Sequence, residues 1–278
     1  MKDTILVATD LSANSRAGVR FALQLARQAG SSLVFYHCLT LMKPTRWSEG
    51  TYSAYVKKEV QEAQVSLEKF VVDMDAGAKP RKGKFEYLVT HHTDIVKAIV
   101  DSASAAKASA ICMSTRGAGR LKKIMGTHAS AIVQASPIPV FVIPKNYRAK
   151  PVIHILYASD LKSIGTELKE VKRFSGKLKA RVTIYHYDYL ADLEEARKEL
   201  EKVAARYKAR DLHFKFQKFN IDKSLGQHLN DDARRSKSSL AVLFTDQERG
   251  WFDKLFLSSR AADAVFDSKV PLLILHKK

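Results

Sequence analysis

Three short segments recur in the same order in the two halves of the 278-residue chain, and this repeat constrains the fold most. The matching pairs are residues 4–11 with 154–161, 36–38 with 185–187, and 136–143 with 268–275. The offset is 150 for the first pair and 132 for the last, so the second copy is shorter in the middle. The sequence therefore predicts two tandem copies of one domain, at 1–146 and 151–278.

Short apolar runs alternate with helical patterns in each copy, which favours βαβ units and a parallel sheet. The runs are apolar throughout, as expected for strands that helices cover on both faces. Thr93 and Asp94 form an N-cap for a helix to about residue 106, and another helix is expected at 128–136. The expected strands are 3–9, 32–39, 84–90, 109–114 and 139–144, and then 152–159, 180–187, 212–219, 239–245 and 271–276.

The composition is that of an ordinary globular protein with an excess of positive charge. No apolar run approaches the roughly 20 residues that span a bilayer, and the N-terminus runs directly into a strand, so we expect a cytosolic protein. The net charge of +18 is spread over both halves. No nucleic-acid-binding motif accompanies this charge, so we expect a solvated basic surface and no nucleic-acid partner. Cys38 and Cys112 lie in apolar runs without zinc-site spacing, and no metal is expected.

Candidate ligand-binding residues follow three of the expected strands in the first copy. In open parallel sheets, ligands bind at the carboxyl ends of the strands. Asp10, Leu11 and Ser12 follow the first strand, and Cys38 ends the second. After the fourth comes a glycine-rich, basic loop that leads into a helix, with Ser114, Arg116, Gly117, Gly119, Arg120, Gly126 and Thr127. Glycines and a helix start suit a phosphate, although a flexible surface loop with a helix cap has the same composition.

Together, the strand ending in Asp10, the His37-Cys38 strand end, the glycine-rich loop and the last strand resemble the universal stress protein family. The resemblance covers nearly the whole chain. It implies an α/β fold of two open twisted sandwiches, each with a five-stranded parallel sheet of order 3-2-1-4-5, the adenine nucleotide alpha hydrolase-like fold. It also implies that ATP or a related adenine nucleotide binds the first domain.

The nucleotide-binding branch of that family carries Gly-x2-Gly-x9-Gly-[Ser/Thr] after the fourth strand. By resemblance, Gly117 and Gly126 are its second and third glycines, and Thr127 supplies the hydroxyl. Asp10 matches the aspartate that contacts adenosine, and Cys38 a residue whose backbone contacts adenine. This chain departs from the motif in two ways: Ser114 replaces the first glycine, and eight residues instead of nine separate Gly117 from Gly126.

The second copy lacks the glycines of this loop. The offset of 132 places Asp246, Arg249, Ser258 and Ser259 at the positions of Ser114, Gly117, Gly126 and Thr127, with the bulky Trp251 and Phe252 between them. A carboxylate at residue 246 would repel a triphosphate. We therefore expect the second copy to be a structural partner that binds no nucleotide, although Arg249 could hold an anion.

These observations leave several functions open. The first is a cytosolic stress-response protein whose first domain binds an adenine nucleotide for sensing or regulation; the alternative is a scaffold of the same family that binds none. We expect no enzyme activity, slow ATP hydrolysis being the weakest hypothesis. His37 and His186 are interpreted as residues of the fold, and His91-His92 as a loop pair. The resemblance implies that the two copies pair through residues 140–143 and 272–275, with larger assemblies open.

Overall fold

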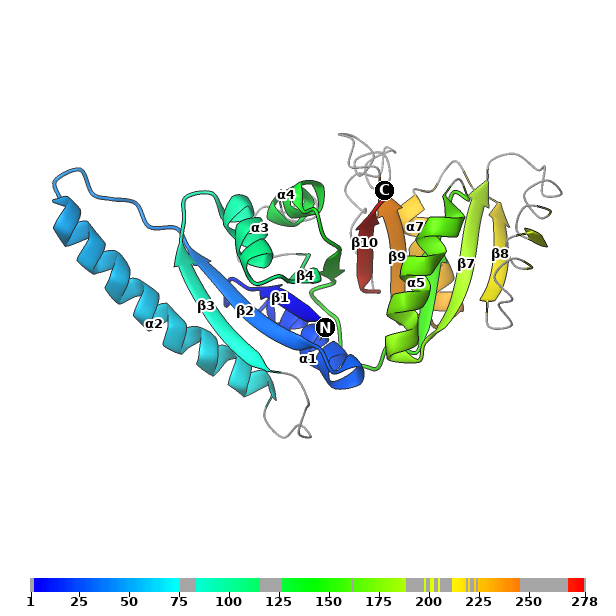
Figure 1. Cartoon of the computed structure of the whole chain (residues 1–278), viewed down its shortest axis with the longest axis horizontal. Helices are drawn as coiled ribbons and strands as arrows, with labels where there is room; N and C mark the ends of the chain where they lie inside the picture. Colours follow the sequence, from blue (N-terminus) through cyan, green and yellow to red (C-terminus); the bar gives the residue numbers. More distant parts are fainter. Residues whose placement is uncertain are drawn as a thin grey trace. The chain divides into compact units, whose positions relative to one another are not determined.

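The computed structural model describes residues 3–75, 84–115, 127–161, 163–188, 212–218, 225–245 and 270–277, with single residues 198, 201, 202, 205, 220 and 223. The chain forms two compact units, Met1–Ala149 and Lys150–Lys278. The first unit alternates strands and helices, and the described part of the second unit contains five strands and two helices (Figure 1). Among the described helices, none is long and apolar enough to cross a membrane.

The first unit contains a five-stranded parallel sheet. Its elements are β1 (Thr4–Ala8), α1 (Arg16–Ala29), β2 (Ser32–Leu39), α2 (Glu49–Asp75), β3 (Phe85–His91), α3 (Ile95–Ala105), β4 (Ala110–Ser114), α4 (Thr127–Ala135) and β5 (Val140–Ile143). The strand order is β3-β2-β1-β4-β5, and the pairs are parallel. The expected fold class and strand order are confirmed.

Helices cover both faces of this sheet, which explains its continuous apolar strands. α1 packs on α2, and α3 packs on α4, so that each pair forms a layer. Figure 1 shows α2 running along β3. α3 begins where the sequence predicts, because the Asp94 side chain accepts a hydrogen bond from the Lys97 N–H at 3.0 Å. The core strands β1 and β4 are buried along almost their whole length.

The second unit repeats the plan. Its described elements are β6 (His154–Ala158), α5 (Ile164–Leu178), β7 (Arg181–Asp188), β8 (Leu212–Lys218), α7 (Leu225–Arg235), β9 (Leu240–Thr245) and β10 (Leu272–His276). The parallel order is β10-β9-β6-β7-β8. The strands end within two residues of the expected bounds in both units.

Backbone details recur between the units. The N–H of Ser109 donates to the Thr4 carbonyl at 2.8 Å, and the N–H of Ser239 donates to the His154 carbonyl at the same distance. After the first strand of each unit a leucine adopts a left-handed conformation, with φ of 60° at Leu11 and 68° at Leu161. The repeat is therefore present in the backbone structure as well as in the amino-acid sequence.

α1 approaches β4 very closely at Gly18. A Cβ atom on Gly18 would lie 3.0 Å from the Ser114 nitrogen and 3.1 Å from the Met113 carbonyl carbon. These are main-chain atoms, which cannot rotate away as a flexible side chain can. A larger residue at this point of α1 would therefore require the main chain of β4 to shift by a few tenths of an ångström.

We expect Gly18→Ala to lower the free energy of unfolding of the first unit by about 1–3 kcal/mol, because the methyl group overpacks the contact with β4. This loss outweighs the gain of about 1 kcal/mol that alanine gives in a helix. Urea denaturation of the full chain measures the change. Gly176→Ala in α5 is the matched control: its Cβ meets nothing within 4 Å, so stability should rise. A stabilised Gly18→Ala protein would contradict the close contact.

Candidate functional site

The carboxyl ends of β1 and β4 lie side by side in the middle of the first sheet. Val7 pairs with Cys112 in the register of these strands. The chain leaves β1 toward β2 on one side, and leaves β4 toward β5 on the other. The two connections therefore leave the sheet in opposite directions at its switch point, which is where open parallel sheets bind ligands. Asp10–Ser12 and Ser114 both lie at this edge.

The turn after β1 is held by its own side chains. The Leu11 N–H donates to Thr9 Oγ1 at 3.1 Å, and the Ser12 N–H donates to Asp10 Oδ1 at 3.1 Å. Thr9 Oγ1 lies 2.8 Å from Ser15 Oγ, which joins the turn to the start of α1. Asp10 itself is exposed. The turn thus presents a carboxylate at the carboxyl edge in a fixed orientation.

Ser114 connects the end of β4 to α1. Its buried hydroxyl accepts a hydrogen bond from the Gly18 N–H at 2.9 Å and donates to the Ser15 carbonyl at 3.2 Å. The Gly18 N–H belongs to the first turn of α1, where no helical carbonyl can satisfy it. The serine therefore performs a task within the domain that a glycine could not.

The rest of the predicted loop is only partly covered. Arg116, Gly117 and Gly126 lie outside the described residues, as do their counterparts in the second copy, Asp246 to Ser259. Thr127 begins α4, one residue before the expected helix start. The roles of these residues stay predictions.

At the end of β2, a histidine holds the first turn in place. His37 Nδ1 bonds to the Thr9 carbonyl at 2.8 Å, and His186 Nδ1 bonds to the Ser159 carbonyl at 2.9 Å in the second unit. The same contact in both copies confirms that these histidines belong to the fold. Cys38, the next residue after His37, is half-buried, and its Sγ lies 3.9 Å from the His92 carbonyl.

The His91-His92 pair also makes contacts within the fold. His91 is the last residue of β3, and its Nε2 lies 3.0 Å from the Leu41 carbonyl and 3.2 Å from the Tyr52 hydroxyl. His92 Nδ1 accepts a hydrogen bond from the Asp94 N–H at 2.9 Å. Within the part of the chain that the structure describes, no group of three His, Cys, Asp or Glu could hold a metal ion.

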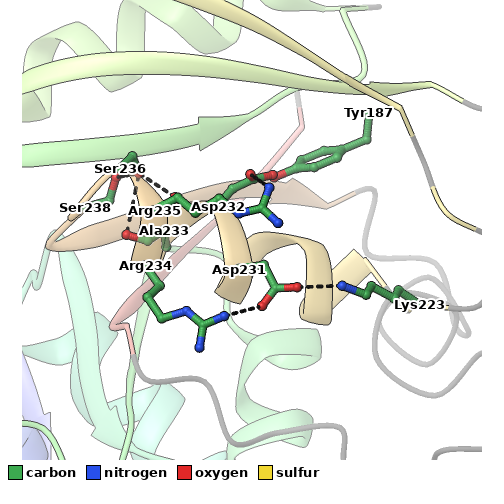
Figure 2. A network of polar contacts seen from close by, with 9 residues as sticks. All are labelled: Tyr187, Lys223, Asp231, Asp232, Ala233, Arg234, Arg235, Ser236 and Ser238. Atoms are coloured by element: carbon green, nitrogen blue, oxygen red, sulfur yellow. Dashed lines mark hydrogen bonds and ion pairs between the residues drawn. The ribbon is translucent and has the colours of Figure 1, made fainter.

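The second unit has a different environment at the position of Cys38. Tyr187 stands there, and its hydroxyl donates to Asp232 Oδ2 of α7 at 2.9 Å (Figure 2). Asp232 is buried and also pairs with Arg235, with 3.6 Å between the charged atoms. Desolvation and the adjacent carboxylate raise the pKa of the Tyr187 phenol, so it stays a hydrogen-bond donor. A fixed phenol thus replaces a small thiol.

The counterpart of Asp10 in the second unit, Asp160, also has a polar contact. Its Oδ2 accepts a hydrogen bond from Lys277 Nζ at 2.6 Å. Lys277 directly follows β10, so this ion pair joins the carboxyl ends of β6 and β10. The sequence comparison did not predict it, because the partners are 117 residues apart.

Sequence reasoning missed Thr9, Ser15 and Gly18 as residues that shape the site. Thr9 has a signal in the repeat, since Ser159 retains a hydroxyl at the same position. Leu161 N–H donates to Ser159 Oγ at 3.1 Å, as Leu11 N–H does to Thr9. Gly18 has no such signal, because residue 168 of the second copy is a leucine.

Comparison with known proteins gives a consistent picture of the fold. The family described as "Universal stress protein family" matches residues 1–144. No curated protein matches the chain.

Several solved structures resemble both units together. A universal stress protein from Archaeoglobus fulgidus DSM 4304 is 16% identical, with 99% of this chain and 98% of that chain covered and a TM-score of 0.71. A putative universal stress protein from Pseudomonas aeruginosa UCBPP-PA14 is 18% identical, with 99% and 93% covered and a TM-score of 0.60. The cytoplasmic domain of a prokaryotic cation chloride cotransporter is 12% identical, with 99% and 95% covered and a TM-score of 0.52. At these identities the likeness concerns the fold alone.

We expect Ser114→Ala to lower the free energy of unfolding by about 1–3 kcal/mol, because it leaves the buried Gly18 N–H without an acceptor. Ser114→Gly should lose as much, although glycine is the residue of the family motif. Ser109→Ala is the control, since its exposed hydroxyl only adds to a backbone bond to the Thr4 carbonyl. Thermal and urea denaturation measure these changes. Equal stability of the Ser114 and Ser109 variants would contradict the assigned role.

Proposed function

The chain belongs to the universal stress protein family, and we propose that its first domain binds ATP or a related adenine nucleotide. The bound nucleotide serves sensing or regulation, and the chain does not turn it over efficiently. The observation that carries the proposal is the meeting of the Asp10 turn and the end of β4 at the switch point of the sheet. The end of β4 is linked to the start of α1, because Ser114 accepts a hydrogen bond from the Gly18 N–H and donates one to the Ser15 carbonyl. Ser15 is bonded in turn to Thr9 of the turn.

Asp10 is the residue best placed to recognise a ribose. Its Oδ1 accepts the Ser12 N–H, which orients the carboxylate, and the turn lies at the carboxyl edge. A carboxylate is a strong acceptor for a hydroxyl group, which is how dinucleotide-binding folds recognise ribose. The match of Asp10 to the family's adenosine-contacting aspartate supports the same role.

The phosphates would lie against the loop after β4. Gly117 and Gly126 allow a close backbone approach there, and the start of α4 at Thr127 offers free N–H groups. Arg116 adds a positive charge. We propose that the adenine lies against the backbone at Cys38, which is half-buried at the end of β2.

The second copy supports the proposal by contrast. It has Arg249 and Ser258 at the positions of the two loop glycines. At the adenine position it has Tyr187, whose phenol is bound to Asp232. We propose that the second domain is a structural partner without nucleotide. Its pairing with the first through β5 and β10 stays a prediction, as does location in the cytosol.

Titration with ATP while the melting temperature is followed tests nucleotide binding. We expect a saturable rise in the wild type at physiological salt, since a ligand at 100 times its Kd stabilises the native state by about 2.7 kcal/mol. Asp10→Ala should weaken binding at least about tenfold, the effect of losing roughly 1.4 kcal/mol. Asp160→Ala, the same change in the second copy, should leave the affinity unchanged. Gly126→Val should abolish the shift, with Ser258→Val as its matched control.

Two outcomes of this titration would contradict the proposal. No shift at millimolar ATP would favour the scaffold function instead. A shift that inorganic triphosphate reproduces, and that persists in Asp10→Ala, would come from the net charge of +18.

The reactivity of the two thiols provides a second test, which shows whether the adenine lies beside Cys38. Cys38 is half-buried, whereas Cys112 is buried and its burial raises the pKa of its thiol, so only Cys38 should react with a thiol reagent in the native protein. Saturating ATP should slow that reaction severalfold. Cys38→Ser should remove all reactivity until denaturant exposes Cys112. If ATP stabilises the protein but leaves the rate at Cys38 unchanged, the adenine lies elsewhere.

A further inference from the structure

The second unit contains a buried histidine that the proposed nucleotide site does not involve. His154, the first residue of β6, is 4% exposed. Its Nδ1 lies 3.0 Å from the Ser236 carbonyl oxygen and 3.2 Å from Ser238 Oγ, and its Nε2 lies 2.8 Å from Thr183 Oγ1. The ring therefore joins β6 to β7 and to the segment between α7 and β9.

These contacts define the neutral form of the ring. The Ser236 carbonyl can only accept a hydrogen bond, so Nδ1 carries the proton. In the neutral imidazole Nε2 is then an acceptor, and the Thr183 hydroxyl donates to it. The segment after α7 is itself tightly bonded, with Ser236 Oγ 2.7 Å from Ser238 Oγ and 2.6 Å from the Asp232 carbonyl (Figure 2).

The charged groups that most affect the ring are cationic. Desolvation lowers the pKa of His154, and the charges of Arg181 on β7 and of Lys215 and His213 on β8 lower it further, against the bond to the Ser236 carbonyl. On α7, Asp232 is bound to Tyr187 and Arg235. A protonated ring could still donate hydrogen bonds from both nitrogens. Protonation is therefore unfavourable for an electrostatic reason, because it places a buried positive charge near other cations.

The first unit has none of this polar cluster at the corresponding positions. The repeat places Thr4 at His154, Val34 at Thr183, Ala106 at Ser236 and Ala108 at Ser238. Leu88 stands where Lys215 does. The backbone bonds at this corner are nevertheless the same, from Ser109 to Thr4 and from Ser239 to His154. The second copy therefore has a titratable group at a position where the first copy, with the same backbone hydrogen bond, has a threonine.

We propose that His154 is an acid-sensitive latch of the second domain. The neutral ring joins β6, β7 and the segment after α7. Protonation of the ring in mild acid weakens the packing of these three segments and leaves the first domain unchanged. The sign follows from linkage. The histidine binds its proton more weakly in the folded state, so the latch holds fully above the unfolded pKa of about 6.5. Its stabilisation is lost as the pH falls below that value, toward the lower folded pKa.

Hydrogen–deuterium exchange of the full chain tests the latch, with rates corrected for the intrinsic effect of pH. Between pH 7.5 and 5.5 the opening equilibrium at residues 225–245 should rise severalfold, up to about tenfold, which is the limit for one histidine at one pH unit below 6.5. The equivalent segment of the first unit, residues 95–114, should change less than about twofold. Equal changes in the two segments would overturn the proposal.

Matched variants assign the effect to His154. His154→Asn keeps a donor for the Ser236 carbonyl but cannot titrate, so the extra opening at pH 5.5 should vanish. His186→Asn removes the half-buried histidine at the end of β7 and should leave that opening unchanged. Lys215→Met removes an exposed cation, favours the protonated ring in the folded state and should reduce the opening. An acid effect that persists in His154→Asn would overturn the proposal. If that variant does not fold, nitrogen NMR of the wild-type ring decides, because a pKa of His154 at or above the unfolded value of about 6.5 would also overturn the proposal.

Discussion

The closeness of α1 to β4 is the constraint on which the first domain depends. Gly18 has no Cβ, so α1 can come within van der Waals distance of the main chain at Met113 and Ser114. This contact brings the first-turn N–H of Gly18 to the Ser114 hydroxyl. The hydrogen bond between Ser15 and Thr9 then fixes the turn that carries Asp10 relative to α1. The position of the candidate site thus depends on the close contact between α1 and β4.

The second domain fills the same region in another way. At the offset of 150, Tyr157, Glu167 and Leu168 stand where the first copy has Val7, Ala17 and Gly18. All three are buried, and the Tyr157 hydroxyl donates to the Glu167 carboxylate. Larger side chains between helix and strand exclude a contact like that of Gly18. The second copy therefore differs from the first in the packing of its helix on the sheet as well as in the loop sequence. The cytoplasmic domain of a cation chloride cotransporter has a similar fold, and one fold can carry different functions.

How much could be predicted depended on whether the cause was local. The strands were predicted within two residues, because buried parallel strands are continuous apolar runs with clear ends. The Asp94 cap and the paired histidines His37 and His186 were likewise readable from neighbouring residues or from the repeat. The task of Ser114 was not, because its partners Ser15 and Gly18 precede it by 99 and 96 residues. The ion pair of Asp160 and the contacts of His154 depend on similarly distant partners.

The left-handed conformation of Leu11 and Leu161 belongs to the architecture of the two domains and is not a sign of function. A left-handed conformation at a leucine is strained by about 1–2 kcal/mol, and such strain often marks a functional site. Here it occurs in both domains, with the same hydroxyl–amide bond beside it, although the second copy has Arg249 and Ser258 at the positions of Gly117 and Gly126. The strain in this turn is thus a property of the fold that both copies share, and it does not depend on the sequence of the loop after β4 or β9.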